Sequence, residues 1–318
     1  MFSVDDMRAK IAKGYEINKS EAMQLAKEKN VVLSNMAADI QKQYGQLRFE
    51  FCSIINAKSG ACSEDCKFCA QSAVYNTGSP VYGFVERDII IDKARICAEK
   101  GISRFSIVTS GKSLNDDDVS TLCEVVEYLK ENVNIGICAS VGLLSDKHYE
   151  IMRKSGVTRI HNNLETSKRY FSSICTTHLH EDKVRAIEKA KKHGFDICSG
   201  GIIGMGETIE DRIDLAFEAK ELGVVSIPIN IHYPIKGTPF GKLPVLEKDE
   251  IEKAVSLIKI INPKIPVRMA GGRKQLLDSG KGCFIAGSNA AITGDMLTTT
   301  GISIDEDISM VKRLGYIV

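Results

Sequence analysis

Three cysteines lie close together in the chain, at Cys62, Cys66 and Cys69. Their C-x3-C-x2-C spacing lets one short loop supply thiolates to three corners of an iron–sulfur cube. A cubane has four irons, so three protein ligands leave one iron free. The spacing therefore predicts a 4Fe-4S cluster whose fourth iron is open to bind another molecule.

Two other uses of clustered cysteines fit this chain less well. Structural zinc sites are closed by four ligands, commonly in two C-x2-C pairs, and neither a second pair nor a nearby C-x-x-H accompanies this loop. Disulfides form in oxidising compartments, whereas the first residues include Asp5, Asp6 and Arg8 and contain no apolar signal region. We therefore expect a cytoplasmic chain with reduced thiols.

Composition favours one large enzyme domain. The 318 residues are 43% hydrophobic and 26% charged, which is enough to bury a sizeable core. The formal net charge of +1 gives no reason to expect nucleic acid or an anionic membrane as a partner. No apolar stretch approaches the roughly 18 residues of a membrane span.

Short strand-like runs alternate with amphipathic helix-like segments, which favours a (β/α)8 barrel. We predict a helical cap over residues 1–46 and the barrel over residues 47–318. The expected strands are 49–55, 105–109, 134–141, 159–164, 196–203, 226–231, 266–270 and 283–287. The expected helices between them are 88–100, 117–131, 145–155, 181–193, 211–222 and 248–260.

In such a barrel, functional side chains lie at the carboxyl ends of strands or in the loops that follow. The cysteine loop follows the first expected strand. An interior filled only for stability carries Val, Ile and Leu, so polar or sulfur-bearing strand residues indicate a site. These residues are Ser106, Cys138, Asn163, Cys198, Asn230 and Arg268. The remaining strand and helix cysteines are expected to pack in the core, and they are Cys52, Cys97, Cys123 and Cys283.

Several stretches together resemble the biotin synthase family of radical S-adenosylmethionine enzymes. They are NAKSGACSEDCKFCAQS at 56–72, CSGGIIGMGET at 198–208, SIPIN at 226–230, KGTP at 236–239 and VRMAGGR at 267–273. The resemblance extends from about Arg48 to the C-terminus. It implies insertion of sulfur between the methyl and methylene carbons of dethiobiotin, with one S-adenosylmethionine consumed for each C–H bond broken.

The same resemblance assigns roles to individual residues. Cys62, Cys66 and Cys69 would hold the cluster that binds S-adenosylmethionine. Phe68 and Ile202 would flank its adenine, Glu165 would contact the ribose, and Lys183 stands where the family has an arginine for the methionyl carboxylate. Lysine keeps the charge but loses the bidentate fork. Asn163 and Asn230 would hydrogen-bond the ureido ring of the substrate. His161 replaces a common asparagine, which implies one altered substrate contact.

The ligands of a second, auxiliary cluster depart from the family pattern. The family holds a 2Fe-2S cluster, the sulfur donor, on three cysteines and an arginine. Cys138, Cys198 and Arg268 match three of these ligands, but the third cysteine position falls on Ser106, and serine oxygen is a poor ligand for an iron–sulfur centre.

Two explanations of the altered ligand set remain open. In the preferred one, Cys175 joins Cys138 and Cys198 as the third thiolate, the cluster has two or four irons, and Arg268 lies nearby. In the other, the auxiliary cluster is absent and the enzyme performs C–H chemistry or a rearrangement without sulfur insertion. An electron-transfer or iron–sulfur storage protein would need the cysteine loop but not Asn163, Glu165, Asn230 and Arg268. The resemblance also implies a homodimer and an electron donor such as flavodoxin or ferredoxin.

Overall fold

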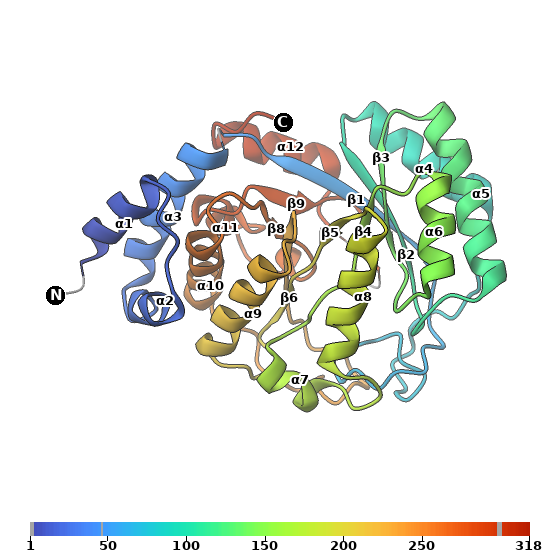
Figure 1. The fold of residues 1–318 in the computed structure, drawn as a ribbon, viewed down its shortest axis with the longest axis horizontal. Coiled ribbons are helices and arrows are strands. Elements are labelled where there is room, and N and C mark those ends of the chain that lie inside the picture. Colours follow the sequence, from blue (N-terminus) through green and yellow to red (C-terminus); the bar gives the residue numbers. More distant parts are fainter. Residues whose placement is uncertain (1–2, 46, 298–300) are drawn as a thin grey trace.

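A parallel sheet of nine strands forms the centre of the computed structural model, which describes residues 3–45, 47–297 and 301–318. The strand order is β5-β4-β3-β2-β1-β9-β8-β7-β6, and Figure 1 shows helices arranged around this sheet. The strands are β1 (Glu50–Lys58), β2 (Arg104–Thr109), β3 (Gly136–Ser140), β4 (Arg159–His161), β5 (Asp196–Cys198), β6 (Gly201–Ile203), β7 (Ile227–Ile231), β8 (Val267–Met269) and β9 (Ala290–Ile292).

The two ends of the sheet meet, because β5 and β6 are consecutive parts of one extended segment. β5 pairs with β4, and β6 pairs with β7. Single parallel bridges, Glu165 to Gly201 and Cys198 to Ser226, join the same segment to both neighbours. Counting β5 and β6 as one strand gives the eight strands of the predicted barrel.

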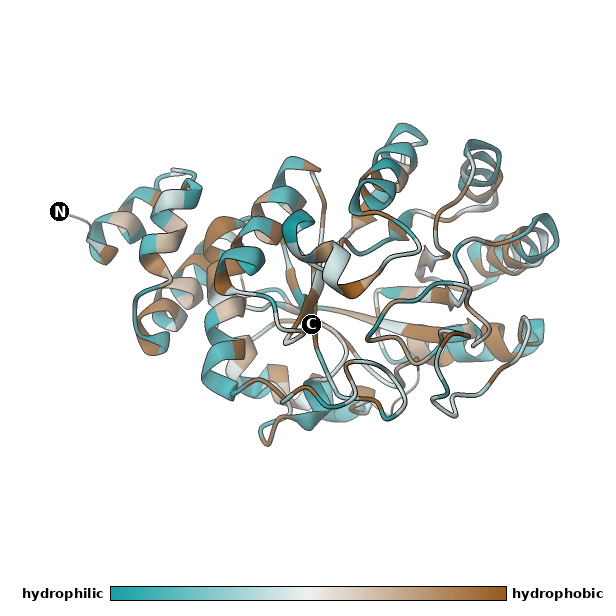
Figure 2. Ribbon diagram, turned by 90° about the horizontal axis from the view of Figure 1, so that it is seen from below, coloured by the Kyte–Doolittle hydropathy of each residue, from teal (hydrophilic) through white to brown (hydrophobic). Residues whose placement is uncertain are grey.

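Helices cover the outside of the sheet, and in Figure 2 their outward faces are largely hydrophilic. Each expected helix forms within two residues of its predicted ends. They are α4 (Arg87–Glu99), α5 (Asp116–Asn132), α6 (Asp146–Ser155), α8 (His180–Lys192), α9 (Ile209–Glu221) and α10 (Lys248–Ile261). The helices α7 (Lys168–Ile174) and α12 (Ile304–Arg313) lie where no element was predicted.

The prediction of a strand over 283–287 is wrong. This segment belongs to a short helix, α11 (Lys281–Ile285), and the last barrel strand is β9, a few residues later. The reason is local: the Asp278 carboxylate accepts hydrogen bonds from the backbone amides of Gly280 and Gly282, each at 3.0 Å. These bonds satisfy amide groups at the start of a helix.

Three helices precede the barrel: α1 (Val4–Ala12), α2 (Lys19–Leu25) and α3 (Asn30–Gly45). They lie at one side of it in Figure 1, beside α10 and α11. Their buried side chains, such as Ile11, Leu25 and Met36, belong to the same hydrophobic core cluster as the barrel strands. The predicted boundary residue, Gln46, lies outside the described residues.

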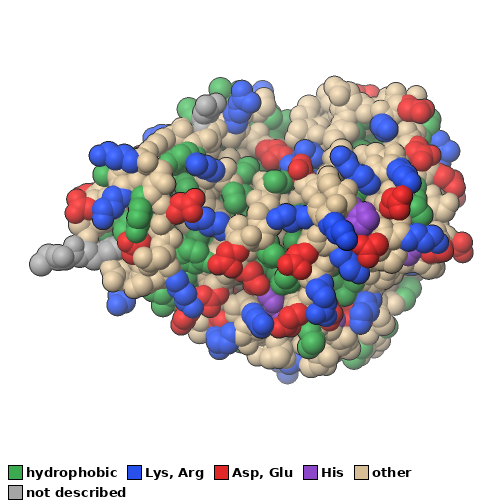
Figure 3. All heavy atoms as spheres, viewed as in Figure 1, with side chains coloured by type: hydrophobic (Ala, Val, Ile, Leu, Met, Phe, Trp, Pro, Cys, Tyr) green, Lys and Arg blue, Asp and Glu red, His purple; other side chains and the backbone are tan. Residues whose placement is uncertain are grey.

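Charged side chains of both signs are intermingled over the face shown in Figure 3. This pattern agrees with the small net charge of the sequence. Among the described residues, no helix is long and apolar enough to cross a membrane.

Candidate functional site

A single cavity of about 420 Å³ runs through the barrel interior and gathers nearly all of the predicted site residues. This volume lies in the ordinary range for small-molecule sites. The predicted residues that line it are Cys62, Cys66, Phe68, Cys69, Cys138, Asn163, Glu165, Lys183, Cys198, Ile202, Asn230 and Arg268. Cys175 is the one predicted site residue that is not among them.

The cysteine loop lies at the carboxyl end of β1. The end of the cavity that it borders is called the upper end, and the opposite end is called the lower end. Backbone bonds fold the loop back on itself: the Cys62 amide donates to the Gln71 carbonyl at 3.1 Å, and the Cys69 amide donates to the Cys66 carbonyl at 2.9 Å. The Gln71 side chain also accepts from the Gly60 amide at 3.2 Å. The three thiols are half-buried and border one volume, as a shared cluster requires.

Two thiols of this loop, Cys66 and Cys69, carry protons when no metal is bound. Burial raises the pKa of Cys69 to about 11. A hydrogen bond with Cys175, together with burial, raises the pKa of Cys66. Iron binding would have to displace these protons, which couples cluster assembly to pH.

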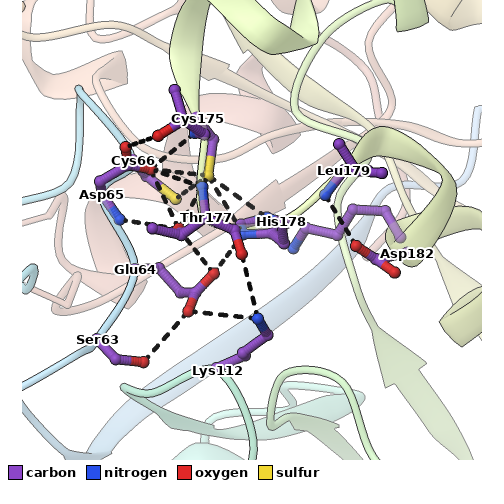
Figure 4. A network of polar contacts seen from close by, with 12 residues as sticks. Ser63, Glu64, Asp65, Cys66, Lys112, Cys175, Thr177, His178, Leu179 and Asp182 are labelled. Atoms are coloured by element: carbon purple, nitrogen blue, oxygen red, sulfur yellow. Dashed lines mark hydrogen bonds and ion pairs between the residues drawn. The ribbon is translucent and has the colours of Figure 1, made fainter.

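Cys175 lies beside Cys66 of the cysteine loop (Figure 4), and it does not border the cavity that Cys138 and Cys198 line. Its Sγ is 3.7 Å from Cys66 Sγ and 3.2 Å from His178 Nδ1. It caps the carboxyl end of α7, where the Lys67 amide donates to the Ile174 carbonyl at 2.9 Å and ties the two segments together. The expected grouping of Cys175 with Cys138 and Cys198 is therefore not what the structure shows.

A polar network surrounds Cys175 (Figure 4). His178 Nδ1 is 2.6 Å from a Glu64 carboxylate oxygen, and the Asp65 carboxylate accepts from the Thr176 amide at 2.8 Å. A hydrogen bond from Cys66, followed by bonds from His178 and Thr177, lowers the pKa of Cys175 to about 4, although burial opposes the shift. Donor atoms of Cys66, Cys175 and His178 lie within 4.8 Å of one another, so a metal ion there would compete with the cluster for Cys66.

Two carboxamide side chains, Asn163 and Asn230, line the middle of the cavity. Asn163 donates to Glu165 at 3.3 Å and accepts from the Gly200 amide at 3.2 Å. Asn230 accepts from the Gly271 amide at 2.9 Å and donates to the Gly201 carbonyl at 3.3 Å. These bonds fix the orientation of both carboxamides, which still border the cavity.

Two ionic groups, Glu165 and Lys183, border the cavity toward its upper end, where the Glu165 carboxylate lies near Cys66 and Cys69. Glu165 has a left-handed backbone with φ of 70°, which is uncommon outside glycine. Lys183 projects from α8, and its Nζ donates to the Asn162 carboxamide at 3.2 Å. His161 is also present, and burial lowers its pKa to about 4, so its imidazole is neutral.

The glycines at 200 and 201 allow backbone segments to touch each other. A Cβ at Gly200 would lie 2.0 Å from the Pro228 carbonyl oxygen, and one at Gly201 would lie 2.3 Å from the Glu165 carbonyl oxygen. Side chains at these positions would force apart the strands that close the barrel. The absence of a side chain at these two positions therefore allows the strands of the cavity wall to pack closely.

The lower end of the cavity carries Cys138, Cys198 and Arg268 on three different strands. The strand register places Ser106 beside Cys138, and His161 beside Cys198. All of these side chains border the cavity, so Ser106 occupies the position where the family resemblance expects a cysteine. Burial raises the pKa of Cys138 and of Cys198, so both thiols are neutral without metal.

Cys52 also lines this lower end, contrary to the expectation that it packs in the core. Its Sγ accepts a hydrogen bond from Arg268 Nη1 at 3.2 Å. Inward-facing residues alternate along a barrel strand, and Cys52 precedes Ile54, a cavity residue, by two positions. That alternation was the signal in the sequence that could have identified Cys52.

A cluster of charged side chains lies next to these thiols. It was not predicted from the sequence. Glu50 contacts Arg268 at 2.8 Å, and Arg104 and Arg159 each at 3.4 Å. Burial opposes the charge on Glu50, but Arg268, Arg159 and Arg104 lower its pKa overall. The part-exposed Asp196 lies 3.6 Å from Arg159 and 3.9 Å from Arg104.

Three guanidinium groups and two carboxylates leave a positive charge at this end of the cavity. The buried Nε of Arg159 has no hydrogen-bond acceptor among the described residues. Buried positive charge without full compensation is costly, whereas a cluster on three thiolates is anionic. The residues at this end therefore fit an iron–sulfur cluster.

Comparisons with known families divide the chain into two matched parts. Residues 57–219 match the Radical SAM superfamily. Residues 228–317 match the Biotin and Thiamin Synthesis associated domain. The first match contains the cysteine loop, and the second contains Asn230 and Arg268.

Curated relatives resemble the chain over nearly its full length. Biotin synthase from Brachyspira hyodysenteriae is 48% identical over 99% of this chain and 94% of its own. Biotin synthase from Clostridium botulinum is 47% identical over 99% of both chains, and biotin synthase 2 from Corynebacterium diphtheriae is 45% identical over 99% of this chain and 96% of its own.

Solved structures share the fold at low sequence identity. Methylornithine synthase (PylB) superposes with a TM-score of 0.83 at 16% identity, covering 98% of this chain and 96% of its own. The hydrogenase maturase HydG from Carboxydothermus hydrogenoformans gives a TM-score of 0.82 at 16% identity, covering 98% and 78% of the two chains. These likenesses confirm the predicted barrel fold.

Proposed function

Because the chain belongs to the biotin synthase family within the Radical SAM superfamily, we propose that it inserts sulfur into dethiobiotin to form biotin. S-adenosylmethionine is the proposed cosubstrate. The observation that carries the proposal is one cavity with the cysteine loop at its upper end, carboxamides in its middle and Cys138, Cys198 and Arg268 at its lower end. Both C–H activation and sulfur delivery then act on one enclosed substrate.

At the upper end, Cys62, Cys66 and Cys69 are proposed to hold a 4Fe-4S cluster. When bound, this group supplies reductive cleavage of S-adenosylmethionine to a radical that removes hydrogen from carbon. Lys183 offers the positive charge that suits the methionyl carboxylate, and Glu165 offers acceptors for ribose hydroxyls. Phe68 and Ile202 supply apolar surface for the adenine.

In the middle, Asn163 and Asn230 are proposed to bind the ureido ring of dethiobiotin. A ureido group has two N–H donors and one carbonyl acceptor. A carboxamide can accept from the N–H groups through its oxygen and donate to the carbonyl through its NH2 group. Existing bonds to backbone groups hold the two amides in place, so little ordering entropy is lost when substrate binds.

At the lower end, an auxiliary iron–sulfur cluster is proposed as the sulfur donor, with Cys138 and Cys198 among its ligands. Arg268 lies among these thiols, and its buried guanidinium helps to neutralise an anionic group there. The electron donor is proposed to be a flavodoxin or ferredoxin, and the enzyme a cytoplasmic homodimer.

The direct test incubates the anaerobically reconstituted protein with dithionite, S-adenosylmethionine and dethiobiotin. We expect biotin together with 5′-deoxyadenosine and methionine, with about two S-adenosylmethionine molecules consumed for each biotin. Formation of 5′-deoxyadenosine without biotin would contradict sulfur insertion and favour C–H chemistry of another kind. Failure to cleave S-adenosylmethionine in a protein with a full cluster would contradict the radical function itself.

A further inference from the structure

We propose that Cys52 is the third thiolate ligand of the auxiliary iron–sulfur cluster, together with Cys138 and Cys198, and that Arg268 donates hydrogen bonds to sulfur instead of coordinating iron. This inference rests on the proposed function, because it assigns ligands to the cluster at the lower end of the cavity. It assigns to Cys52 the role that Ser106 cannot fill.

The first argument is position. In the strand register Ile54 on β1 pairs with Ser106 on β2, and Cys52 lies one inward-facing step before Ile54. With strands about 4.8 Å apart and a rise of about 3.3 Å per residue, the Cα atoms of Cys52 and Ser106 are roughly 8 Å apart. A thiol at Cys52 can therefore reach a metal group that also borders Ser106.

The second argument is the convergence of thiols on Arg268. Cys52 Sγ is 3.2 Å from Arg268 Nη1. Cys52, Cys138 and Cys198 all border the same cavity as Arg268, and all three lie close enough to its guanidinium to raise the pKa of Arg268. They come from three different strands, β1, β3 and β5, and so converge on this end of the cavity from separate parts of the barrel.

The third argument is that the protonated guanidinium of Arg268 already donates hydrogen bonds from each of its nitrogens or pairs with a carboxylate. Its Nε donates to Ser226 Oγ at 3.3 Å, and its Nη1 donates to the carbonyls of Glu50 and Ala291, each at 3.2 Å. Nη2 forms the 2.8 Å ion pair with Glu50. Coordination of iron would require a guanidinium nitrogen to lose its proton, which these acceptors and the adjacent carboxylate oppose. An N–H···S bond to a cluster ligand keeps every one of these contacts.

The other thiols are placed elsewhere. Cys97 and Cys123 are buried in α4 and α5, and Cys283 is buried in α11. Cys175 is held by Cys66 and His178 at the upper end. Three thiolates at Cys52, Cys138 and Cys198 would also offset the surplus positive charge of Arg104, Arg159 and Arg268.

The test measures iron, acid-labile sulfide and Mössbauer spectra in a protein that lacks the upper cluster. The parent carries Cys62→Ala, Cys66→Ala and Cys69→Ala, and we expect it to retain the auxiliary cluster after anaerobic purification. Adding Cys52→Ala should remove nearly all of that iron, as should adding Cys138→Ala. Adding Cys283→Ala or Cys175→Ala, which also delete a buried thiol, should leave the iron content unchanged.

A rescue variant separates loss of a ligand from loss of folding. In the same parent, Cys52→Ser combined with Ser106→Cys moves the thiol to the neighbouring strand and should restore the iron that Cys52→Ser alone removes. Circular dichroism and the melting temperature report folding of each variant. Iron that persists at the parent level after Cys52→Ala would overturn the ligand assignment while leaving an auxiliary cluster in place. A folded parent without iron would overturn the auxiliary cluster itself, and sulfur donation by it.

Discussion

The two ends of the cavity both present cysteine thiols, but they assemble them in different ways. The upper thiols come from one loop of eight residues, Cys62 to Cys69, and are half-buried. The lower thiols come from separate strands and, apart from the half-buried Cys52, are buried, with arginines around them. A loop of this kind can meet a partner at the surface, whereas a ligand set built across a barrel is shielded from solvent. The difference suits the roles proposed for the two ends, electron entry at the upper end and sulfur storage at the lower end.

The largest effect is expected from the upper loop. Cys62→Ala, Cys66→Ala or Cys69→Ala should each reduce S-adenosylmethionine cleavage by roughly a thousandfold or more, about 4 kcal/mol in the barrier, because the cluster loses a ligand. Quantifying 5′-deoxyadenosine by chromatography measures this. Cys97→Ala, which deletes a thiol from α4, is the matched control and should keep cleavage near the unmodified rate. Normal cleavage in a loop variant would contradict the placement of the cluster.

The lower end should separate the two reactions. Cys138→Ala or Cys198→Ala should lower biotin formation by roughly a hundredfold or more, because the sulfur donor is lost. Cleavage of S-adenosylmethionine should stay within a few-fold of the unmodified protein, since the upper loop is untouched. Measuring biotin and 5′-deoxyadenosine in the same reaction checks both. Equal loss of the two products would show that the ends do not act separately.

Charge at the upper end should affect binding of the cosubstrate. Lys183→Ala should raise the KM for S-adenosylmethionine by roughly thirtyfold, about 2 kcal/mol for a charge-assisted hydrogen bond. Lys183→Arg should keep the KM near the original value, because it retains the charge. Initial rates over a range of S-adenosylmethionine concentrations measure the effect. Lys192→Ala, an exposed change on the same helix, should leave the KM unchanged.

The rate of iron removal should differ between the two ends of the cavity, because the upper end is more accessible to solvent. An iron chelator should extract iron from the half-buried upper loop roughly tenfold faster than from the enclosed lower site. Mössbauer spectra recorded during the extraction can separate the two populations. Release of both clusters at one rate would show that burial of the lower thiols does not govern access.

The smallest effect is expected at Cys175. Cys175→Ser should change biotin yield and iron content by less than about threefold, because it perturbs one contact of the upper loop and removes no ligand from the lower site. Iron analysis and the biotin assay measure this. A complete loss of biotin with cleavage retained would instead favour Cys175 as an auxiliary ligand.

Sequence patterns were sufficient for the barrel and for the cysteine loop. Strand and helix periodicity is local, and the C-x3-C-x2-C spacing lies within one loop, so neither needs long-range contacts to be recognised. The segment at 283–287 was mistaken for a strand because its apolar run is compatible with either structure. The Asp278 carboxylate accepts hydrogen bonds that stabilise the start of a helix here. A pattern of hydrophobic residues gives no information about such bonds.

The sequence alone determined the fold class, the family and the loop that is proposed to hold the radical-generating cluster, because these depend on local order along the chain. Only the tertiary structure decided which distant cysteines share a site. It brought Cys175 to Cys66 at the upper end and Cys52 to Arg268 at the lower end. The physical reason is that a barrel interior is composed of alternate residues from every strand, so its neighbours are set by register and closure and not by distance along the chain.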